Sequence, residues 1–424
     1  MSSPPTRRPA EPAAPRTGRL LIDRTFGPWF AGNVVSNAGN WLFNVVAAVV
    51  VFQLTRSALL VGLVSVAQFV PAVLLAPFAG AVCDRRDRRR VLLVSQAVST
   101  VAATALAVTV ASLGVDGLPG VWPILAAAVG IGIGQAFAIP ALNALVPALV
   151  DDVDLESAVA LTSLTFNLGR AFGPAASGVL LATVGAEIAF VANAASFAPL
   201  LLALLVIRPR PSDTSAGGPD DPADDRSARA GLRWVRDDRR VLALLVAVAA
   251  VGFAIDPVIT LAPPLADVLG GPPELVSAMV TGFGLAAIPG ALASGRLQRA
   301  RGSLPIARAG TLVVAAGLTV AALAPSPAVA VVGFAICGTG FVLAVTSVTS
   351  LLQRVVPDVL RGRVMALWSV AFLGARPLAA VIDGAVADRV GPRLAMLVAI
   401  AVAGAAAWLL GRLDARGGLR PPTG

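Results

Sequence analysis

The chain has 424 residues, of which 57% are hydrophobic and only 13% are charged. Soluble proteins carry about 25% charged residues, so this composition excludes a soluble globular protein. The net charge is +9, and every basic residue is an arginine. Such a charge can indicate nucleic-acid binding, but a membrane protein acquires it from its cytoplasmic loops, so we expect no nucleic-acid partner. Cys83 and Cys337 lack the spacing of a disulfide framework or a metal site.

Long apolar segments fill most of the chain after a polar stretch over residues 1–24, which predicts a disordered tail. A helix needs about 20 residues to cross a bilayer. Twelve segments of roughly this length are expected at 28–52, 57–83, 91–112, 122–144, 158–183, 187–207, 240–263, 274–297, 305–324, 328–352, 362–386 and 393–412. The prediction is an all-α polytopic membrane protein. Its first helices occupy 25–207, a linker follows over 208–239, and the remaining helices occupy 240–412 before a tail over 413–424.

The arginines indicate how the chain is oriented. Most of them fall in the two tails, in the loop after the second segment and in the central linker. The positive-inside rule therefore predicts that both termini are cytoplasmic. The arginine-only, alanine-rich composition is typical of a GC-rich bacterial genome. We expect a multi-pass protein of the bacterial inner (plasma) membrane, working as a monomer in the lipid bilayer.

The two halves of the chain resemble each other. Pro77 and Pro289 are 212 residues apart, and each closes the segment before a basic loop. The stretch 143–147 recurs as 353–357. A weak repeat of six helices joined by a polar linker predicts two six-helix bundles related by an axis along the membrane normal.

The loop after the second segment reads Gly80-Ala-Val-Cys-Asp-Arg-Arg-Asp-Arg-Arg-Arg90. It resembles the loop signature of the major facilitator superfamily, in which a glycine is followed by an acid and then by basic residues. Gly80 would allow close helix approach, and Asp84 could meet the positive end of a facing helix. The family has a glycine where this chain has Asp87. The expected cytoplasmic gate comprises Gly80, Asp84, Arg85, Arg88, Arg89, Arg361 and Arg363, and the alternative is a basic anchor that contacts only lipid phosphate.

A second motif lies in the fifth segment, Asn167-Leu-Gly-Arg-Ala-Phe-Gly-Pro-Ala-Ala-Ser-Gly178. It looks like the antiporter motif of drug:proton exchangers in the same superfamily. Gly169 and Gly173 form a small-residue face that favours close packing, and Pro174 frees a backbone carbonyl and bends the helix. Gly178 ends the motif. Ordinary helix packing is the alternative, but it would not require Arg170.

Several segments together are similar to the enterobactin-exporter and macrolide-efflux branch of the superfamily. They are 36–41, 144–147, 167–178 and 356–365. The resemblance implies the major facilitator fold and an exporter without a cofactor or metal. Members of this branch often carry an aspartate where this chain has Asn40, which removes one candidate proton carrier.

Four charged residues lie inside the apolar segments: Arg170, Asp256, Arg376 and Asp383. Each costs about 2.5–3.5 kcal/mol at a helix centre, so all four are candidates for proton coupling. Arg376 and Asp383 are seven residues apart and share one helix face. Because the chain has no histidine, a proton must be carried by a carboxylate. One alternative is a static pair of Arg376 with either aspartate, and another is that Asp383 lies at the wet outer end.

Uncharged polar residues indicate the substrate pathway. Four asparagines of the first segment recur at spacings of four, three and four, which places them in one stripe. A single asparagine in a membrane helix usually bonds neighbouring helices, whereas a stripe exceeds that need. The expected pathway residues are Asn33, Asn37, Asn40, Asn44, Trp41, Gln68, Gln135 and Asn143.

These features predict a secondary active transporter that exports a hydrophobic or amphipathic small molecule by alternating access, with protons as coupling ions. A drug, a siderophore or a secondary metabolite would fit. The first alternative is an uptake or facilitated-diffusion carrier for a small nutrient. A membrane sensor or an enzyme is remote, because the longest loop contains no histidine or cysteine and no metal-ligand spacing.

Overall fold

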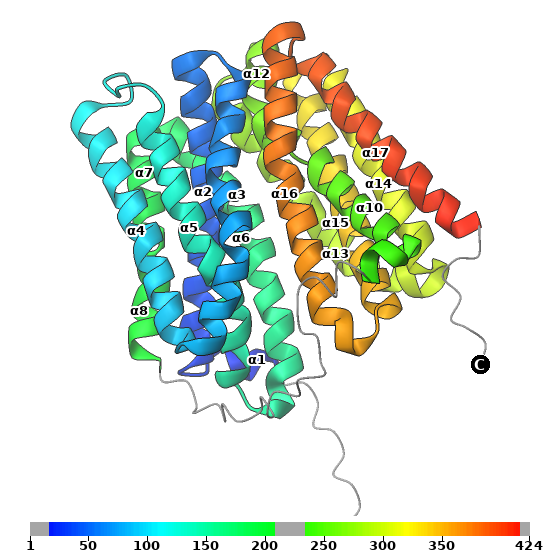
Figure 1. Ribbon diagram of the computed structural model, residues 1–424. Helices are drawn as coiled ribbons and strands as arrows, with labels where there is room; N and C mark the ends of the chain where they lie inside the picture. Colours follow the sequence, from blue (N-terminus) through cyan, green and yellow to red (C-terminus); the bar gives the residue numbers. More distant parts are fainter. Residues whose placement is uncertain (1–16, 208–233, 416–424) are drawn as a thin grey trace, which may run out of the picture.

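The computed structural model describes residues 17–207 and 234–415, and every element in these two stretches is helical (Figure 1). Most of the expected tail 1–24 and linker 208–239, and residues 416–424, lie outside the described residues. The end of the tail is ordered, since α1 (Thr17–Leu21) is helical and Leu20 is buried.

The first bundle consists of seven α-helices after α1. Two short 3-10 turns, Val146–Ala148 and Asp152–Asp154, join α5 to α6. The α-helices are α2 (Phe26–Thr55), α3 (Ala58–Arg85), α4 (Arg88–Leu113), α5 (Trp122–Leu145), α6 (Leu155–Thr183), α7 (Gly185–Ser196) and α8 (Ala198–Val206).

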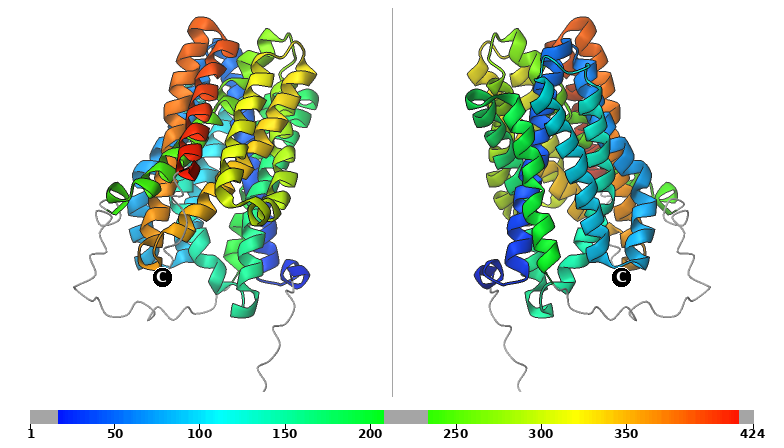
Figure 2. Two further views of the ribbon diagram at one scale, coloured as in Figure 1. Left: turned by 90° about the vertical axis from the view of Figure 1, so that its right-hand side faces the viewer. Right: turned by 90° about the vertical axis from the view of Figure 1, so that its left-hand side faces the viewer.

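The second bundle follows the same order. Its described helices are α10 (Arg239–Ala254), α11 (Pro257–Thr260), α12 (Ala262–Val268), α13 (Glu274–Arg301), α14 (Ser303–Ala322), α15 (Pro327–Val355), α16 (Asp358–Val390) and α17 (Pro392–Ala415). Figure 2 shows the long helices of both bundles running lengthwise between the same two ends of the molecule.

Eleven segments of the described chain are long and apolar enough to cross a membrane. The twelfth expected span is α6, whose 29 residues are also sufficient in length. Glu156, Asn167 and Arg170 are among the polar residues of this helix. The prediction of twelve transmembrane helices in two six-helix bundles is confirmed: eleven spans are both long and apolar enough to cross a membrane, and α6 supplies the twelfth by its length and position.

Two spans expected to be continuous are interrupted. The segment 187–207 breaks at Phe197, just before Pro199, and the segment 240–263 breaks at Asp256 and again at Leu261. Proline has no N–H group to donate within a helix, so a helix tends to end before it. The break before Pro257 leaves Asp256 at a helix junction instead of inside a regular turn.

Small residues allow the closest helix contacts inside the second bundle. Gly310 and Gly317 of α14 face Gly333 and Gly340 of α15, and a Cβ atom on any of them would meet the partner's backbone. This is the small-residue packing used by membrane helices, which gain no hydrophobic stabilisation by associating in lipid. Cys337, which is buried, lies at the same contact beneath Gly317.

The two bundles meet mainly through α3 with α16 and α6 with α13. We call the end with Arg56, Asp267 and Asp388 the closed end, which is uppermost in Figure 1. The opposite end, with α1 and the loop between α3 and α4, is called the basic end. Contacts between the start of α3 and the end of α16 show that the two helices run antiparallel.

Candidate functional site

An ion pair joins the bundles at the closed end. Arg56 Nη1 lies 2.6 Å from Asp267 Oδ1, with side chains 67% and 53% exposed. Arg56 is the one non-glycine residue of the described chain with a positive φ angle, 55°, and it ends α2. Exposed pairs of this kind contribute about 0–1 kcal/mol, so this contact is a minor part of the closure.

Asp388 makes the stronger contact at this end. From the last turns of α16 its carboxylate accepts hydrogen bonds from the Ser57 hydroxyl and the Ala58 N–H, each at 2.6 Å, and a longer one of 3.3 Å from the Leu59 N–H. The N-terminus of a helix has unpaired N–H groups and a partial positive charge, both of which favour a carboxylate. One bundle therefore caps a helix of the other. Sequence analysis missed Asp388; the available signal was the serine at the expected start of α3.

Glycines bring α3 and α16 together just below this cap. A Cβ atom on Gly384 would lie 2.6 Å from the Leu59 Cα, and one on Gly62 would lie 2.8 Å from the Ala380 carbonyl carbon. Both approaches are too close for any side chain. The helices are thus in backbone contact at the closed end.

The glycine motif of the fifth span, α6, forms contacts within the first bundle and contacts with the second bundle. Gly169 and Gly173 pack on α2 of their own bundle, where a Cβ atom on Gly173 would lie 2.6 Å from the Trp41 Cβ. Gly178 packs on Ser277 of the other bundle, and the Ser177 and Ser277 hydroxyls are 3.0 Å apart. Gly169 and Gly173 thus lie in close helix contacts, as expected, and Gly178 lies in a close contact that was not expected.

Pro174 has a consequence for the helix facing it. Because proline lacks an N–H group, the Arg170 carbonyl cannot receive the usual bond from residue 174. A Cβ atom on Gly284 of α13 would overlap this carbonyl oxygen. The carbonyl that Pro174 leaves free therefore faces a position of the other bundle where glycine alone fits.

Three of the four embedded charged residues lie together. Asp256, Arg376 and Asp383 interact electrostatically, and Asp256 and Asp383 are both fully buried. The alternative that Asp383 lies at the wet outer end is therefore wrong. The Thr260 hydroxyl donates to Asp256 Oδ2 at 2.6 Å, but Asp256 Oδ1 and both Asp383 oxygens have no hydrogen-bond partner among the described residues.

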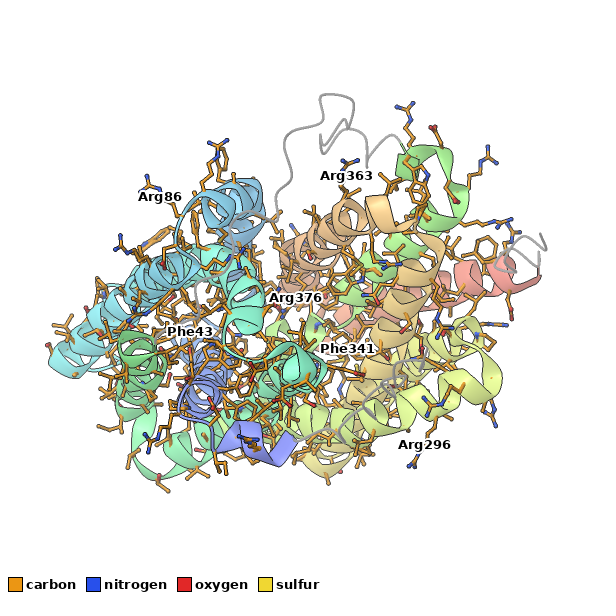
Figure 3. All side chains as sticks on the ribbon, turned by 90° about the horizontal axis from the view of Figure 1, so that it is seen from below. Phe43, Arg86, Arg296, Phe341, Arg363 and Arg376 are labelled. Atoms are coloured by element: carbon orange, nitrogen blue, oxygen red, sulfur yellow. The ribbon has the colours of Figure 1, made fainter. Side chains whose placement is uncertain are left out.

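Arg376 lies next to these acids without forming an ion pair with either one in the described structure. Its guanidinium lies 4.2 Å from the ring centroid of Phe69 on α3, and its Nε has no partner. Figure 3, which views the molecule from the basic end, shows Arg376 between the bundles, whereas Arg86, Arg296 and Arg363 extend at the periphery. The described structure therefore lacks the static ion pair of Arg376 with Asp256 or Asp383 that the sequence left open. The three charges act on one another electrostatically without direct contact.

Arg170 is separate from this cluster. It is 3% exposed, and within the described chain no acidic group pairs with it. Its Nη2 donates to Asn167 Oδ1 at 2.7 Å, its Nε has no partner, and its guanidinium lies over three phenyl rings. The ring centroids are 5.9 Å away for Phe166, 5.8 Å for Phe283 and 5.2 Å for Phe341.

A row of aromatic rings continues from Arg170 through the second bundle. Phe283 stacks on Phe341 at 5.7 Å, Phe341 on Phe372 at 6.1 Å, and Phe372 on Trp368 at 5.3 Å. The Trp368 indole N–H is buried without an acceptor. We call these four rings the aromatic row; sequence analysis did not identify it, because its members come from three separate helices.

The asparagine stripe forms hydrogen bonds inside the first bundle. Asn37 donates to both the carbonyl and the Oδ1 of Asn33, at 2.9 and 3.0 Å, and the buried Asn33 donates to Thr165 Oγ1 at 3.0 Å. Gln135 donates to Asn40 Oδ1 at 3.0 Å. These bonds show that Asn33 and Asn37 lie side by side, and they also supply the helix-bonding role of membrane asparagines.

The remaining pathway residues are spread more widely. Asn44 and Trp41 are half-buried, and Gln68 is buried where α3 crosses Gly132 of α5. Asn143 is exposed near the basic end of α5. The structure thus connects Gln135 with the stripe but does not place Asn143 beside it.

The basic end differs from the gate expected there. A Cβ atom on Gly80 would have no neighbour within 4 Å, so the close helix approach expected at this glycine does not occur in this conformation. Arg89 donates to the Leu204 and Leu205 carbonyls at 2.5 and 2.8 Å, and Arg88 donates to the Ala144 carbonyl at 3.2 Å. These arginines cap helix ends of their own bundle.

The structure gives less information on the other residues of this loop and of the expected gate. Asp87, in place of the family's glycine, caps α4 by accepting from the Arg90 N–H at 2.8 Å and has a φ of −56°, which needs no glycine. Arg85 and Arg361 are exposed, and Arg363 is half-buried. Asp84 belongs to α3, but its side chain lies outside the described residues.

Comparison with known proteins gives consistent matches. The family described as transmembrane secretion effector matches residues 20–416. Macrolide efflux protein A of Streptococcus pyogenes is 25% identical over 63% of this chain and 65% of its own length. The enterobactin exporter EntS of Shigella boydii serotype 4 is 31% identical over 66% of this chain and 65% of its own. The chain thus spans just under two thirds of each relative.

Among solved structures, a bacterial homolog of the human lysosomal transporter Spinster, in an inward-facing and unoccupied conformation, superposes with a TM-score of 0.75. The match covers 97% of this chain and 100% of that one at 13% identity, so it shows the fold alone. With the family match, it confirms the resemblance stated from the sequence. The protein is a multi-pass membrane transporter and not an enzyme, and its relatives include efflux proteins. It belongs to the transmembrane secretion effector family of the major facilitator superfamily.

Proposed function

We propose that this protein exports a hydrophobic or amphipathic small molecule from the bacterial cytoplasm and that proton entry drives the export. A drug, a siderophore or a secondary metabolite fits this description. The cluster of Asp256, Arg376 and Asp383 carries the proposal, because embedded carboxylates are the groups that can bind and release a proton within the membrane. The efflux relatives support the direction of transport.

The two bundles, residues 25–207 and 240–412, are the bodies that move relative to each other, and a single chain suffices. The arginines at the basic end support the assignment of this end, with both termini, to the cytoplasmic side. The closed end then faces outward, and the described conformation is one that is sealed toward the outside. Opening it requires that the Asp388 cap and the glycine contacts between α3 and α16 separate.

Proton binding follows from the position of Asp383 relative to this seal. Asp383 lies five residues before Asp388 on α16, so opening the closed end brings water close to it. In the closed conformation its oxygens are buried without a donor, and a charged carboxylate in such a place is costly. Asp383 thus takes up a proton from outside, and closure buries it in the neutral form beside Asp256 and Arg376.

Transport in everted membrane vesicles tests the proposal. The parent protein should accumulate at least one of ethidium, erythromycin and the anionic 2-naphthoate when respiration generates a proton gradient, and an uncoupler should abolish this accumulation. Asp383→Asn and Asp256→Asn should each reduce accumulation to the uncoupled level while retaining gradient-independent exchange of the probe. Asp116→Asn, which changes an exposed loop acid, serves as the matched control and should behave like the parent.

Two results would contradict the proposal. If Asp383→Asn and Asp256→Asn both accumulate the probes as well as the parent at equal abundance, neither acid of the cluster carries the proton. If none of the three probes shows uncoupler-sensitive accumulation by the parent, the assignment as a proton-driven exporter of such molecules is wrong.

A further inference from the structure

Arg170 is a buried cation without an anionic partner, which requires an explanation. Burying a charge is costly unless it is paired. Of the five N–H donors of the guanidinium, one donates to Asn167 Oδ1 in the described structure. The other embedded arginine, Arg376, has the Asp256 charge nearby. Phenyl rings are a weaker partner for a cation than a carboxylate, so an anion can displace them.

The surroundings of Arg170 combine this charge with flat apolar surface. Two of the three rings over its guanidinium, Phe283 and Phe341, belong to the opposite bundle and begin the aromatic row. At the far end of the row the Trp368 N–H is buried without an acceptor. The site therefore presents a cationic donor, a stack of aromatic faces and a second unpaired donor, contributed by both bundles.

We infer that Arg170 and the aromatic row recognise cargo that carries an anionic group next to an aromatic or extended apolar body. The inference rests on the proposed function as a transporter and specifies its substrate class. The anion replaces the phenyl rings at the Arg170 guanidinium, and the apolar body stacks along Phe341 and Phe372. Carboxylate is the anion that the planar guanidinium fits best, because it can accept two parallel hydrogen bonds.

The contribution of both bundles to this site has a consequence for transport. Phe283 and Phe341 approach Arg170 only while α6 and the second bundle are in contact. Cargo that separates the rings from the guanidinium must itself neutralise the buried charge. An uncharged analogue of the same shape cannot do so, and it leaves Arg170 without either partner.

Binding to the purified full-length protein in detergent, with no proton gradient, tests this inference. The probes are 2-naphthoate and the uncharged 2-naphthamide, which have nearly the same size and shape. We expect 2-naphthoate to bind at least tenfold more tightly. Arg170→Gln should remove this preference, and Arg170→Lys should retain part of it. Arg296→Gln, which changes an exposed arginine at the periphery of Figure 3, is the matched control and should retain all of it.

The inference is overturned if the parent binds the two probes equally, or if the preference survives in Arg170→Gln. If Arg170→Gln fails to fold, the inference is still tested by comparing the binding of the two probes to the parent and to Arg170→Lys. Because no gradient is present, loss of proton-driven accumulation in vesicles would refute the proton coupling without affecting this result.

Discussion

Removing the Asp388 charge should loosen the closed end of the transporter. In Asp388→Asn, the amide oxygen can still accept one hydrogen bond, from the Ala58 N–H or the Ser57 hydroxyl, but the second short contact is lost. The negative charge at the start of α3 is lost as well, a contribution of about 0.3–1 kcal/mol. A hydrogen bond to a charged group contributes about 1.5–3 kcal/mol, and the exposure of Asp388 places the loss at the low end of that range.

We therefore expect the substitution to cost the closed conformation about 1–2 kcal/mol. By the relation between free energy and population, this raises the open fraction about 5- to 30-fold. The assay is the rate at which a membrane-impermeant maleimide labels Ala266→Cys, a buried position in α12 at the closed end, after Cys83 and Cys337 are replaced by serine. Labelling should accelerate by the same factor in Asp388→Asn.

Asp267→Asn is the matched control, because it removes an acid at the same end that forms only the exposed pair with Arg56. Such a pair contributes about 0–1 kcal/mol, so labelling should rise by less than about fivefold. Equal rates in the parent and in Asp388→Asn would refute the reasoning, since the cap would then contribute nothing to closure. A larger effect in Asp267→Asn than in Asp388→Asn would also contradict it.

Two further substitutions test the glycine contact of α6 and the acid at the basic end. Gly173→Leu inserts a side chain against Ala38 and Trp41, where overpacking costs about 1–3 kcal/mol. Transport should therefore fail, or protons should leak across the membrane. The control is Gly404→Leu, at a glycine with open space around it, which should transport like the parent. Full activity of Gly173→Leu at normal abundance would show that the motif has no mechanical role. Asp84→Ala should increase maleimide labelling of single cysteines on the cytoplasmic side of the interface, and unchanged labelling with normal transport would remove Asp84 from the gate.

The helices could be predicted from the sequence because lipid imposes a minimum length on each apolar run. The expected span 122–144 agrees with Trp122–Leu145, and capping serine and aspartate residues begin α3, α4 and α10 at Ser57, Asp87 and Asp238. The interruptions at Phe197 and Asp256 could not be predicted, because membrane helices often continue through proline when neighbouring groups satisfy the freed backbone. Whether they do so depends on contacts between helices, which the local sequence does not contain.

The same limit applies to the site. The four embedded charges could be identified from composition alone, since each stands in an otherwise apolar segment. Which of these charges lie together could not be predicted from the sequence. The expectation that all four share one role in proton coupling does not follow from the structure. Asp256 and Arg376 come from different helices, and Arg170 is surrounded by rings from α13 and α15 that no sequence spacing relates to it.

The antiparallel arrangement of α3 and α16 connects the two ends of the molecule. The end of α16 lies next to the beginning of α3. Closing the basic end would bring the end of α3 next to the beginning of α16, so that an acid in the last turn of either helix could cap the first turn of its partner. At the closed end, Asp388 of α16 meets the start of α3. Asp84 occupies the corresponding position at the end of α3, and the start of α16 is the partner expected for it when the basic end closes. Because a rocking motion separates one pair as it joins the other, two equivalent caps would hold either conformation at similar free energy, which a transporter needs in order to cycle in both directions.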